Sequence, residues 1–221
     1  MNILAIETSG RVMTVALRSN ESFCEFVVNQ GFAHGGALMP AVARVLEQTR
    51  IDPSDINLVS CSRGPGSFTG LRIGMATAKG LARGANCPLK TVATLPLLAA
   101  GREHWPGIVV PLMNARKNRV YTAAFRAGER IQADVDIALD DFMKILPKDE
   151  SILVTGSDAG MAESYHRIVV DPLHAAGRGM AMIHMAQSLF MSEGGDPSDI
   201  GPLYLRLSEA EIGMATKRIG K

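Results

Sequence analysis

The chain has 221 residues, of which 47% are hydrophobic, so it can form one large domain or two small ones around a substantial core. Its 23 Lys and Arg residues nearly balance its 22 Asp and Glu residues, which excludes the global basic field of an autonomous nucleic-acid binder. The three cysteines, Cys24, Cys61 and Cys87, form no Cys-x-x-Cys pair, which argues against a disulfide framework or zinc knuckle and favours a reducing compartment.

Strand and helix patterns alternate along the first half of the chain. Short apolar runs between turn residues are typical of strands, and apolar residues at three- and four-residue steps are typical of helices. The predicted elements are strands at 3–6, 12–17, 23–28 and 56–61, helices at 37–49 and from the turn at 63–70 to 84, and a short buried segment at 92–100. This order predicts an α/β fold in which helices cover a mixed sheet.

The pattern restarts after Trp105. The predicted elements are strands at 108–113, 119–126 and 151–155, a short helix capped by Asp140 or Asp141 and ending at 146, and a long helix at 178–191. Residues 207–221 have no firm apolar period, so we expect this tail to be partly disordered. The apolar start at residues 1–6 is too short for a signal peptide, and we expect no membrane span.

A glycine-rich turn joins the strand at 56–61 to the following helix. Gly64, Pro65, Gly66 and Ser67 stand where backbone amides and the positive end of a helix can bind an anion. The turn is not a Walker A loop, because no Gly-Lys-Ser/Thr triplet closes it. A phosphate cradle and a plain strand-to-helix connection both remain open, the plain connection being the commoner use of such turns.

The helix after this turn carries small residues at four-residue steps, namely Gly70, Gly74, Ala78 and Ala82. Glycine inside a helix costs about 1 kcal/mol relative to alanine, so close approach of another backbone is the expected compensation. The approaching backbone can belong to the chain's own sheet or to a partner.

Several segments together resemble the TsaB (YeaZ) family. They are residues 3–9 (ILAIETS), His34 with Leu38-Met39-Pro40 and Leu46, residues 64–74, and residues 202–206 (PLYLR). The resemblance implies the ASKHA superfold of actin, Hsp70 and sugar kinases, with two lobes that are each a mixed sheet flanked by helices. It places an N-terminal lobe at 1–104 and a smaller lobe at 105–221, with the last segment able to pack back on the first lobe.

In that superfold two turns face a nucleotide. The resemblance assigns this position to Glu7, Thr8 and Ser9 in the first turn and to residues 64–67 in the second. Glu7 could organise a metal ion or simply bond to nearby backbone amides, and residues 156–160 only faintly resemble an adenosine motif. We therefore expect a degenerate nucleotide site.

The catalytic paralogue of the family, TsaD, holds its metal with a His-x-x-x-His pair. The corresponding positions here are Thr94 and Leu98. Thr is a poor metal ligand, and Leu has no atom that can bind a metal. The five histidines show no ligand-like clustering, and His34 is expected to be a capping or interface residue. We expect no metal site, and Glu7 and Asn114, which stand where many relatives have Asp, weaken any acid-dependent role.

The resemblance implies a non-catalytic subunit of the cytoplasmic machinery that makes N6-threonylcarbamoyladenosine at position 37 of tRNAs reading codons that begin with A. Its implied partners are a TsaD-like transferase, a TsaE-like ATPase joined through it, tRNA within the complex, and a second copy when the chain is alone. The candidate partner interface comprises His34, Leu38, Ala41, Val42, Val45, Gly74, Thr77, Ala78 and Leu81. No cofactor is expected for the chain itself, although ATP or ADP can bind at the partner interface; the alternatives are an ASKHA-type ATPase or kinase and a metal-dependent glycopeptidase.

Overall fold

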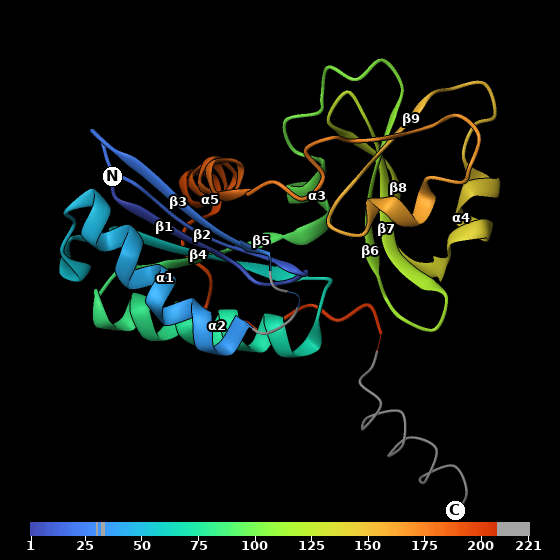
Figure 1. Cartoon of the computed structure of the whole chain (residues 1–221). Helices are drawn as coiled ribbons and strands as arrows, with labels where there is room; N and C mark the ends of the chain where they lie inside the picture. The colour runs from blue at the N-terminus through green and yellow to red at the C-terminus, as the bar shows by residue number, and fades with distance from the viewer. Residues whose placement is uncertain (30, 32–33, 207–221) are drawn as a thin grey trace, which may run out of the picture.

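The computed structural model describes residues 1–29, 31 and 34–206, and Figure 1 shows them as two lobes. The elements of the first sheet and its two long helices are β1 (Ile3–Glu7), β2 (Val12–Arg18), β3 (Phe23–Asn29), α1 (His34–Thr49), η1 (Pro53–Asp55), β4 (Leu58–Gly64), α2 (Phe68–Gly84) and β5 (Leu89–Ala93). The remaining elements are α3 (Thr94–Ala99), β6 (Ile108–Asn114), β7 (Arg119–Arg126), β8 (Glu129–Ala138), α4 (Leu139–Ile145), β9 (Ile152–Thr155), η2 (Ala159–Ala162), β10 (Ile168–Val170) and α5 (Gly179–Glu193). The predicted two-lobed α/β fold is confirmed.

The two sheets repeat one topology. The first has the strand order β3-β2-β1-β4-β5, with β1 antiparallel to β2 and parallel to β4. The second has the order β10-β9-β6-β7-β8, with β6 antiparallel to β7 and parallel to β9. In both sheets, therefore, two tight antiparallel connections are followed by longer crossovers to two parallel strands.

The first sheet is covered on both faces (Figure 1). Leu38 and Val45 of α1 and Met75 of α2 pack on one face, because their helical spacing brings them to a single stripe. Met182 and Ile183 of α5 are fully buried on the opposite face of the same sheet. One face is thus covered by α1 and α2 and the other by α5, which removes the apolar side chains of the sheet from water.

The second sheet is covered by α4 on one face and α3 on the other. Phe142 of α4 is fully buried in the cluster formed with β6, β7 and β9. Leu95 and Leu98 of α3 contact the other face, whereas Leu97 of the same helix belongs to the cluster beneath α5. Helix α3 therefore lies in the cores of both lobes and joins them.

The chain passes between the lobes at 100–107, at 171–178 and again along 194–206. Strands β6 to β10 form the second lobe, but α5 and the segment after it pack on the first lobe. Residues 105–206 are therefore not a single packing unit, because the apolar side chains of α5 pack on the first sheet.

Some elements differ from the sequence-based expectations. Strands β8 and β10 were not predicted, although Ile131, Ala133, Val135 and Ile137 alternate along β8 in the pattern of a strand. The segment 92–100 contributes the end of β5 and then helix α3. The predicted acidic cap of α4 is wrong: the helix begins at Leu139, its cap residue makes no side-chain hydrogen bond, and both aspartates lie in its first turn.

The expectation for residues 207–221 lies outside the described residues. Among the residues that are described, no helix is long and apolar enough to cross a bilayer.

Candidate functional site

The turn after β1 holds a buried carboxyl group at Glu7. This residue is 4% exposed, and its Oε1 accepts a 2.5 Å hydrogen bond from the backbone N–H of Ser9. Its Oε2 has no hydrogen-bond partner among residues 1–29, 31 and 34–206. Burial raises the pKa of the Glu7 carboxyl group, and the bonds from Ser9 and Ser62 oppose this only in part. Glu7 thus makes the backbone bond expected of a structural carboxylate and retains one free oxygen.

Thr8 holds the same turn against α2. It is fully buried, and its Oγ1 donates a 2.8 Å hydrogen bond to the carbonyl oxygen of Gly70. A Cβ at Gly70 would collide with the carbonyl oxygen of Thr8, and one at Gly74 with its hydroxyl oxygen. The small residues of α2 therefore allow close approach to the chain's own sheet, which was one of the two interpretations of their spacing.

The glycine turn contacts the first turn directly. The carbonyl oxygen of Ser9 accepts a 2.7 Å hydrogen bond from the N–H of Ser67, and it would lie 2.6 Å from a Cβ at Gly66. The hydroxyl of Ser67 in turn caps α2 by accepting a 3.3 Å bond from the N–H of Gly70.

The same turn is also covered by the C-terminal part of the chain. Gly64 has a φ of +121°, a conformation that favours glycine, and a Cβ there would collide with the carbonyl oxygen of Leu203. Backbone therefore occupies the space on this side of the turn. The close packing of Leu203 and Ser9 against Gly64 and Gly66 favours the plain strand-to-helix connection, and the phosphate cradle stays a prediction.

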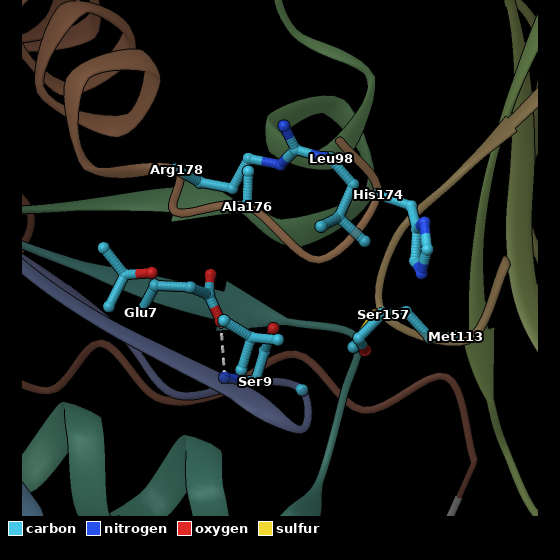
Figure 2. A pocket seen from close by; sticks show the side chains of 11 residues that line it. Glu7, Ser9, Leu98, Met113, Ser157, His174, Ala176 and Arg178 are labelled. Carbon is cyan, nitrogen blue, oxygen red and sulfur yellow. Dashed lines mark hydrogen bonds between the residues drawn. The ribbon is translucent and has the colours of Figure 1, made fainter. Parts of the chain in front are cut away.

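A small pocket, partly open to solvent, lies between the lobes. In Figure 2, Glu7 and Ser9 lie on its first-lobe side, and Ser157 and His174 lie across from them. The lining residues are Glu7, Ser9, Gly10, Val12, Thr14, Leu98, Met113, Ser157, His174, Ala176 and Arg178. Glu7 and Ser9 of the first turn thus line the pocket, whereas Thr8 and residues 64–67 do not, and the nucleotide-facing role of both turns stays a prediction.

The sequence did not point to Arg178 or His174. Ser157 was included only in a faint motif at 156–160, and it does line the pocket. Arg178 and His174 reach the pocket because the chain returns from β10 to α5 beside the first turn, and no local spacing in the sequence signals this return. Leu98, which stands where the paralogue has a metal ligand, lines the pocket as well.

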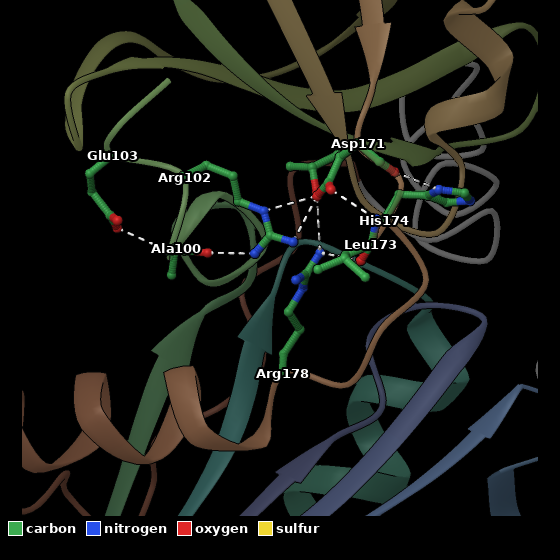
Figure 3. A network of polar contacts seen from close by, with 9 residues as sticks. Ala100, Arg102, Glu103, Asp171, Leu173, His174 and Arg178 are labelled. Atoms are coloured by element: carbon green, nitrogen blue, oxygen red, sulfur yellow. Dashed lines mark hydrogen bonds and ion pairs between the residues drawn. The ribbon is translucent and has the colours of Figure 1, made fainter. Parts of the chain in front are cut away.

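Buried charges connect two of the passages between the lobes (Figure 3). Arg102 donates to Asp171 Oδ2 from Nε at 2.9 Å and from Nη2 at 2.7 Å. Arg178 Nη2 lies 3.9 Å from the same carboxylate oxygen and donates to Thr155 Oγ1 at 3.1 Å. Burial, with the charge of Arg102, lowers the pKa of Arg178 to about 10, so the guanidinium stays charged at neutral pH. We call Arg102, Asp171 and Arg178 the hinge network.

The candidate partner interface falls largely inside the first lobe. His34, Leu38, Ala41, Val42, Val45, Gly74 and Ala78 are buried, and Thr77 and Leu81 are half-buried. His34 Nε2 lies 2.7 Å from the carbonyl oxygen of Gly10. The buried members are core residues in this structure, because the apolar stripes of both helices face their own sheet.

The exposed sides of α1 and α2 carry other residues. They include Met39, Pro40 and Ala43 of α1 and Arg72, Ala76 and Gly80 of α2, which we call the outer helix face. The two helices lie side by side on the same face of the sheet (Figure 1), and Met39 is 51% exposed. Five of these six residues are small or apolar, and the charged residues Arg44, Glu47 and Arg83 are exposed further along the same helices.

In the part of the chain that the structure describes, no three His, Cys, Asp or Glu side chains are grouped so that they could hold a metal ion. The three cysteines are free thiols.

Known proteins with similar sequences identify the family of this two-lobed chain. A family model described as TsaD, tRNA N6-adenosine threonylcarbamoyltransferase, matches residues 31–212. A Bacillus subtilis (strain 168) protein named tRNA threonylcarbamoyladenosine biosynthesis protein TsaB is 32% identical over 224 residues, covering 96% of this chain and 96% of the relative. The chain belongs to the TsaB family.

Another TsaB relative and two solved structures are similar over part or most of the chain. The Escherichia coli (strain K12) TsaB is 37% identical over 136 residues, which are 58% of this chain and 57% of that protein. The solved structure of YeaZ from Pseudomonas aeruginosa has a TM-score of 0.75 at 23% identity and covers 92% of this chain and 99% of its own. The ethanolamine utilization protein EutJ from Carboxydothermus hydrogenoformans reaches 0.50 at 14% identity, covering 83% and 90%. These two structures support the fold assignment.

Proposed function

We propose that the chain is a non-catalytic subunit that binds a TsaD-like transferase and activates N6-threonylcarbamoyladenosine formation at position 37 of tRNAs reading codons that begin with A. Its TsaB relatives are named for the biosynthesis of this nucleoside, and the matching family model is that of the transferase. A TsaE-like ATPase would join through the transferase, tRNA would bind only within the complex, and the complex would work in the cytoplasm.

The outer helix face is the observation that carries the docking part of this proposal. Small residues such as Ala43, Ala76 and Gly80 let a second pair of helices approach closely, and Met39 adapts its shape to a partner. The partner would be related in fold, because the transferase model matches most of this chain. Two related helix pairs can then pack as a four-helix arrangement, and a second copy would use the same face when the chain is alone.

The packing inside the first lobe favours a non-catalytic role for this chain. The carbonyl oxygen of Leu203 lies against Gly64, and Ser9 packs against Gly66, so the chain's own backbone packs closely on the glycine turn. We propose that the chain needs no cofactor of its own and that ATP or ADP, where required, binds at the partner interface.

Reconstitution tests the role. Purified chain, TsaD, TsaE, threonylcarbamoyl-adenylate and substrate tRNA would be combined, and modified adenosine would be measured with and without the chain. We expect modification that requires the chain and none from the chain alone. Equal modification without it would contradict the proposal, and Glu7-dependent ATP hydrolysis by the chain alone would favour an ATPase instead.

A pair of variants tests the docking face. Ala76→Glu puts a carboxylate on the outer helix face, and Ser188→Glu makes a comparable change at an exposed position of α5 on the other side of the sheet. We expect Ala76→Glu to weaken the complex about tenfold or more in a titration, because a longer, charged side chain would have to be desolvated at the interface. Ser188→Glu should bind normally; equal affinities for the two variants would place the interface elsewhere.

A further inference from the structure

The segment at 194–206, which we call the strap, is anchored to the first lobe at its beginning. Asp196 Oδ2 accepts hydrogen bonds from the N–H and the hydroxyl of Thr91 at 2.7 and 2.6 Å. Lys90, whose side chain is 6% exposed, lies 3.2 Å from the other oxygen of Asp196. The start of the strap is therefore fixed along β5.

The middle of the strap lies on the glycine turn and on α2. The N–H of Leu203 donates a 2.7 Å hydrogen bond to the carbonyl oxygen of Arg63. The hydroxyl of Tyr204 accepts a 3.0 Å bond from Arg72 Nε, and its ring centre lies 5.1 Å from that of Phe68. The guanidinium of Arg72 lies 3.9 Å from the centre of the Phe68 ring. Tyr204 thus contacts Arg72 of the outer helix face.

The end of the strap reaches the second lobe. Arg206 binds both oxygens of Asp136 on β8, with Nε at 2.6 Å and Nη2 at 2.8 Å. Its Nη1 donates a 3.0 Å bond to the carbonyl oxygen of Ala115 after β6. Burial would raise the pKa of Asp136, but the bonds from Arg206 and Arg119 hold it below its ordinary value. The strap therefore joins the two lobes through a bidentate ion pair.

The Arg206 pair and the hinge network lie on different sides of the junction. In Figure 1 the strap passes on the side of α1 and α2, whereas the passage that carries Arg178 leads to α5 on the other side of the sheet. The hinge network is deeply buried, with Arg102 and Asp171 side chains 14% and 7% exposed. The side chain of Arg206 is 25% exposed. Water and salt therefore reach the Arg206 pair more easily than the hinge network.

We propose that Arg206 and Asp136 form a releasable clasp that holds the lobes closed over the interlobe pocket, while the hinge network stays intact. We further propose, on the basis of the proposed function, that a partner on the outer helix face acts on this clasp through Arg72 and Tyr204. Docking of the transferase would then set how far the pocket opens.

Hydrogen exchange of the isolated full chain tests the clasp. Arg206→Gln removes the bidentate pair, and Arg126→Gln removes an ion pair to Glu150 that lies within the second lobe. We expect amides at 7–14 and 173–178 to exchange about threefold or more faster in Arg206→Gln, with 200 mM added salt producing part of the same change in the unaltered chain. Arg126→Gln should leave these amides unchanged.

A second variant and the spread of the effect distinguish local opening at the pocket from a general loss of stability. Arg206→Lys keeps the charge but not the bidentate geometry, so it should give an increase between those of the unaltered chain and Arg206→Gln. Unchanged exchange at the pocket in both variants would overturn the clasp. Faster exchange spread equally over α1, β1 and α5 would also overturn it, because the effect would then be loss of overall stability.

The partner is tested separately, by adding TsaD to the unaltered chain and to Tyr204→Phe, which loses the bond from Arg72 but keeps the ring contact. We expect bound TsaD to change exchange at 7–14 in the unaltered chain and to change it less in Tyr204→Phe. Binding without any change at the pocket would overturn the coupling. Absence of binding would instead contradict the proposed function and leave the result on the isolated chain standing.

Discussion

Glu7 combines burial, one short backbone bond and one oxygen without a partner in the described structure. Its position at the end of β1 brings it to the pocket edge, where Arg178 lies on the opposite wall. The charge of Arg178 favours the ionised carboxylate but does not outweigh burial, so the pKa of Glu7 is raised. Glu7 therefore holds its proton at a higher pH in the folded chain than in the unfolded chain.

This shift predicts the pH dependence of Glu7→Gln. With a raised folded pKa, the folded chain loses stability as the pH rises from the ordinary value of 4.5 through the folded value, since the buried group must ionise. Replacing it by the neutral Gln should therefore raise the melting temperature at pH 8 and have little effect at pH 4. Thermal unfolding at both pH values checks this; a stabilisation that is equal at pH 4 and pH 8 would contradict it.

At the scale of elements, α2 uses its two sides differently. Gly70 and Gly74 face Thr8 and allow the helix to approach the sheet closely, whereas nothing lies within 4 Å of a Cβ at Gly80 on the exposed side. The same residue type therefore has opposite consequences along one helix. This explains how a helix with several glycines remains part of the core.

This contrast predicts opposite effects on stability for two substitutions in α2. Gly70→Ala should destabilise the chain by about 2 kcal/mol, because its methyl group collides with backbone that cannot move aside. Gly80→Ala should stabilise it by about 0.5–1 kcal/mol, since only helix propensity changes. Urea unfolding measures both free energies, and a similar effect of the two substitutions would show that Gly70 is not tightly packed.

At the scale of the whole molecule, the lobes are joined by α3, the hinge network and the strap. Burial alone would raise the pKa of Asp171, but the N–H of Leu173, Thr155 and Arg102 together hold it below its ordinary value. The stability that this group contributes is therefore present at neutral pH and is lost as the pH falls below about 3.8 toward the folded pKa. The hinge network should therefore weaken in acid.

Asp171→Asn tests this junction at neutral pH. It leaves two buried arginines without their shared carboxylate and should cost about 3 kcal/mol or more. The single tryptophan, Trp105, packs beside α3 and the second sheet, so its fluorescence reports on the second lobe. We expect fluorescence and far-ultraviolet circular dichroism to give one common transition in the unaltered chain and two in Asp171→Asn.

An exposed ion pair provides the control for this variant. Asp141 pairs with Lys144 on the surface of α4, and both side chains are more than half exposed. Asp141→Asn should change stability by less than about 0.5 kcal/mol and keep a single transition. Separate transitions in this control, or a single one in Asp171→Asn, would mean that the hinge network does not couple the lobes.

The sequence by itself determined the fold class and most elements of both lobes. Alternating apolar residues and helical stripes are local signals, so they identified strands such as 119–126 and the helices that became α1, α2 and α5. Motifs at 3–9, 64–74 and 202–206 pointed to the TsaB family, and the relatives confirm it. Glu7 and Ser9 of the first turn line the pocket, and the expectation that this turn faces a nucleotide stays a prediction.

Only the tertiary structure decided which side of each helix is exposed and which residues complete the pocket. Leu38 and Ala78 look suitable for an interface in the sequence, but an apolar stripe has the same pattern whether it meets the chain's own sheet or a partner. Arg178 lines the pocket with Glu7, and Leu203 covers Gly64, only because distant segments return to the first lobe. Such contacts depend on how the lobes pack, and long-range packing produces no periodic pattern in the sequence.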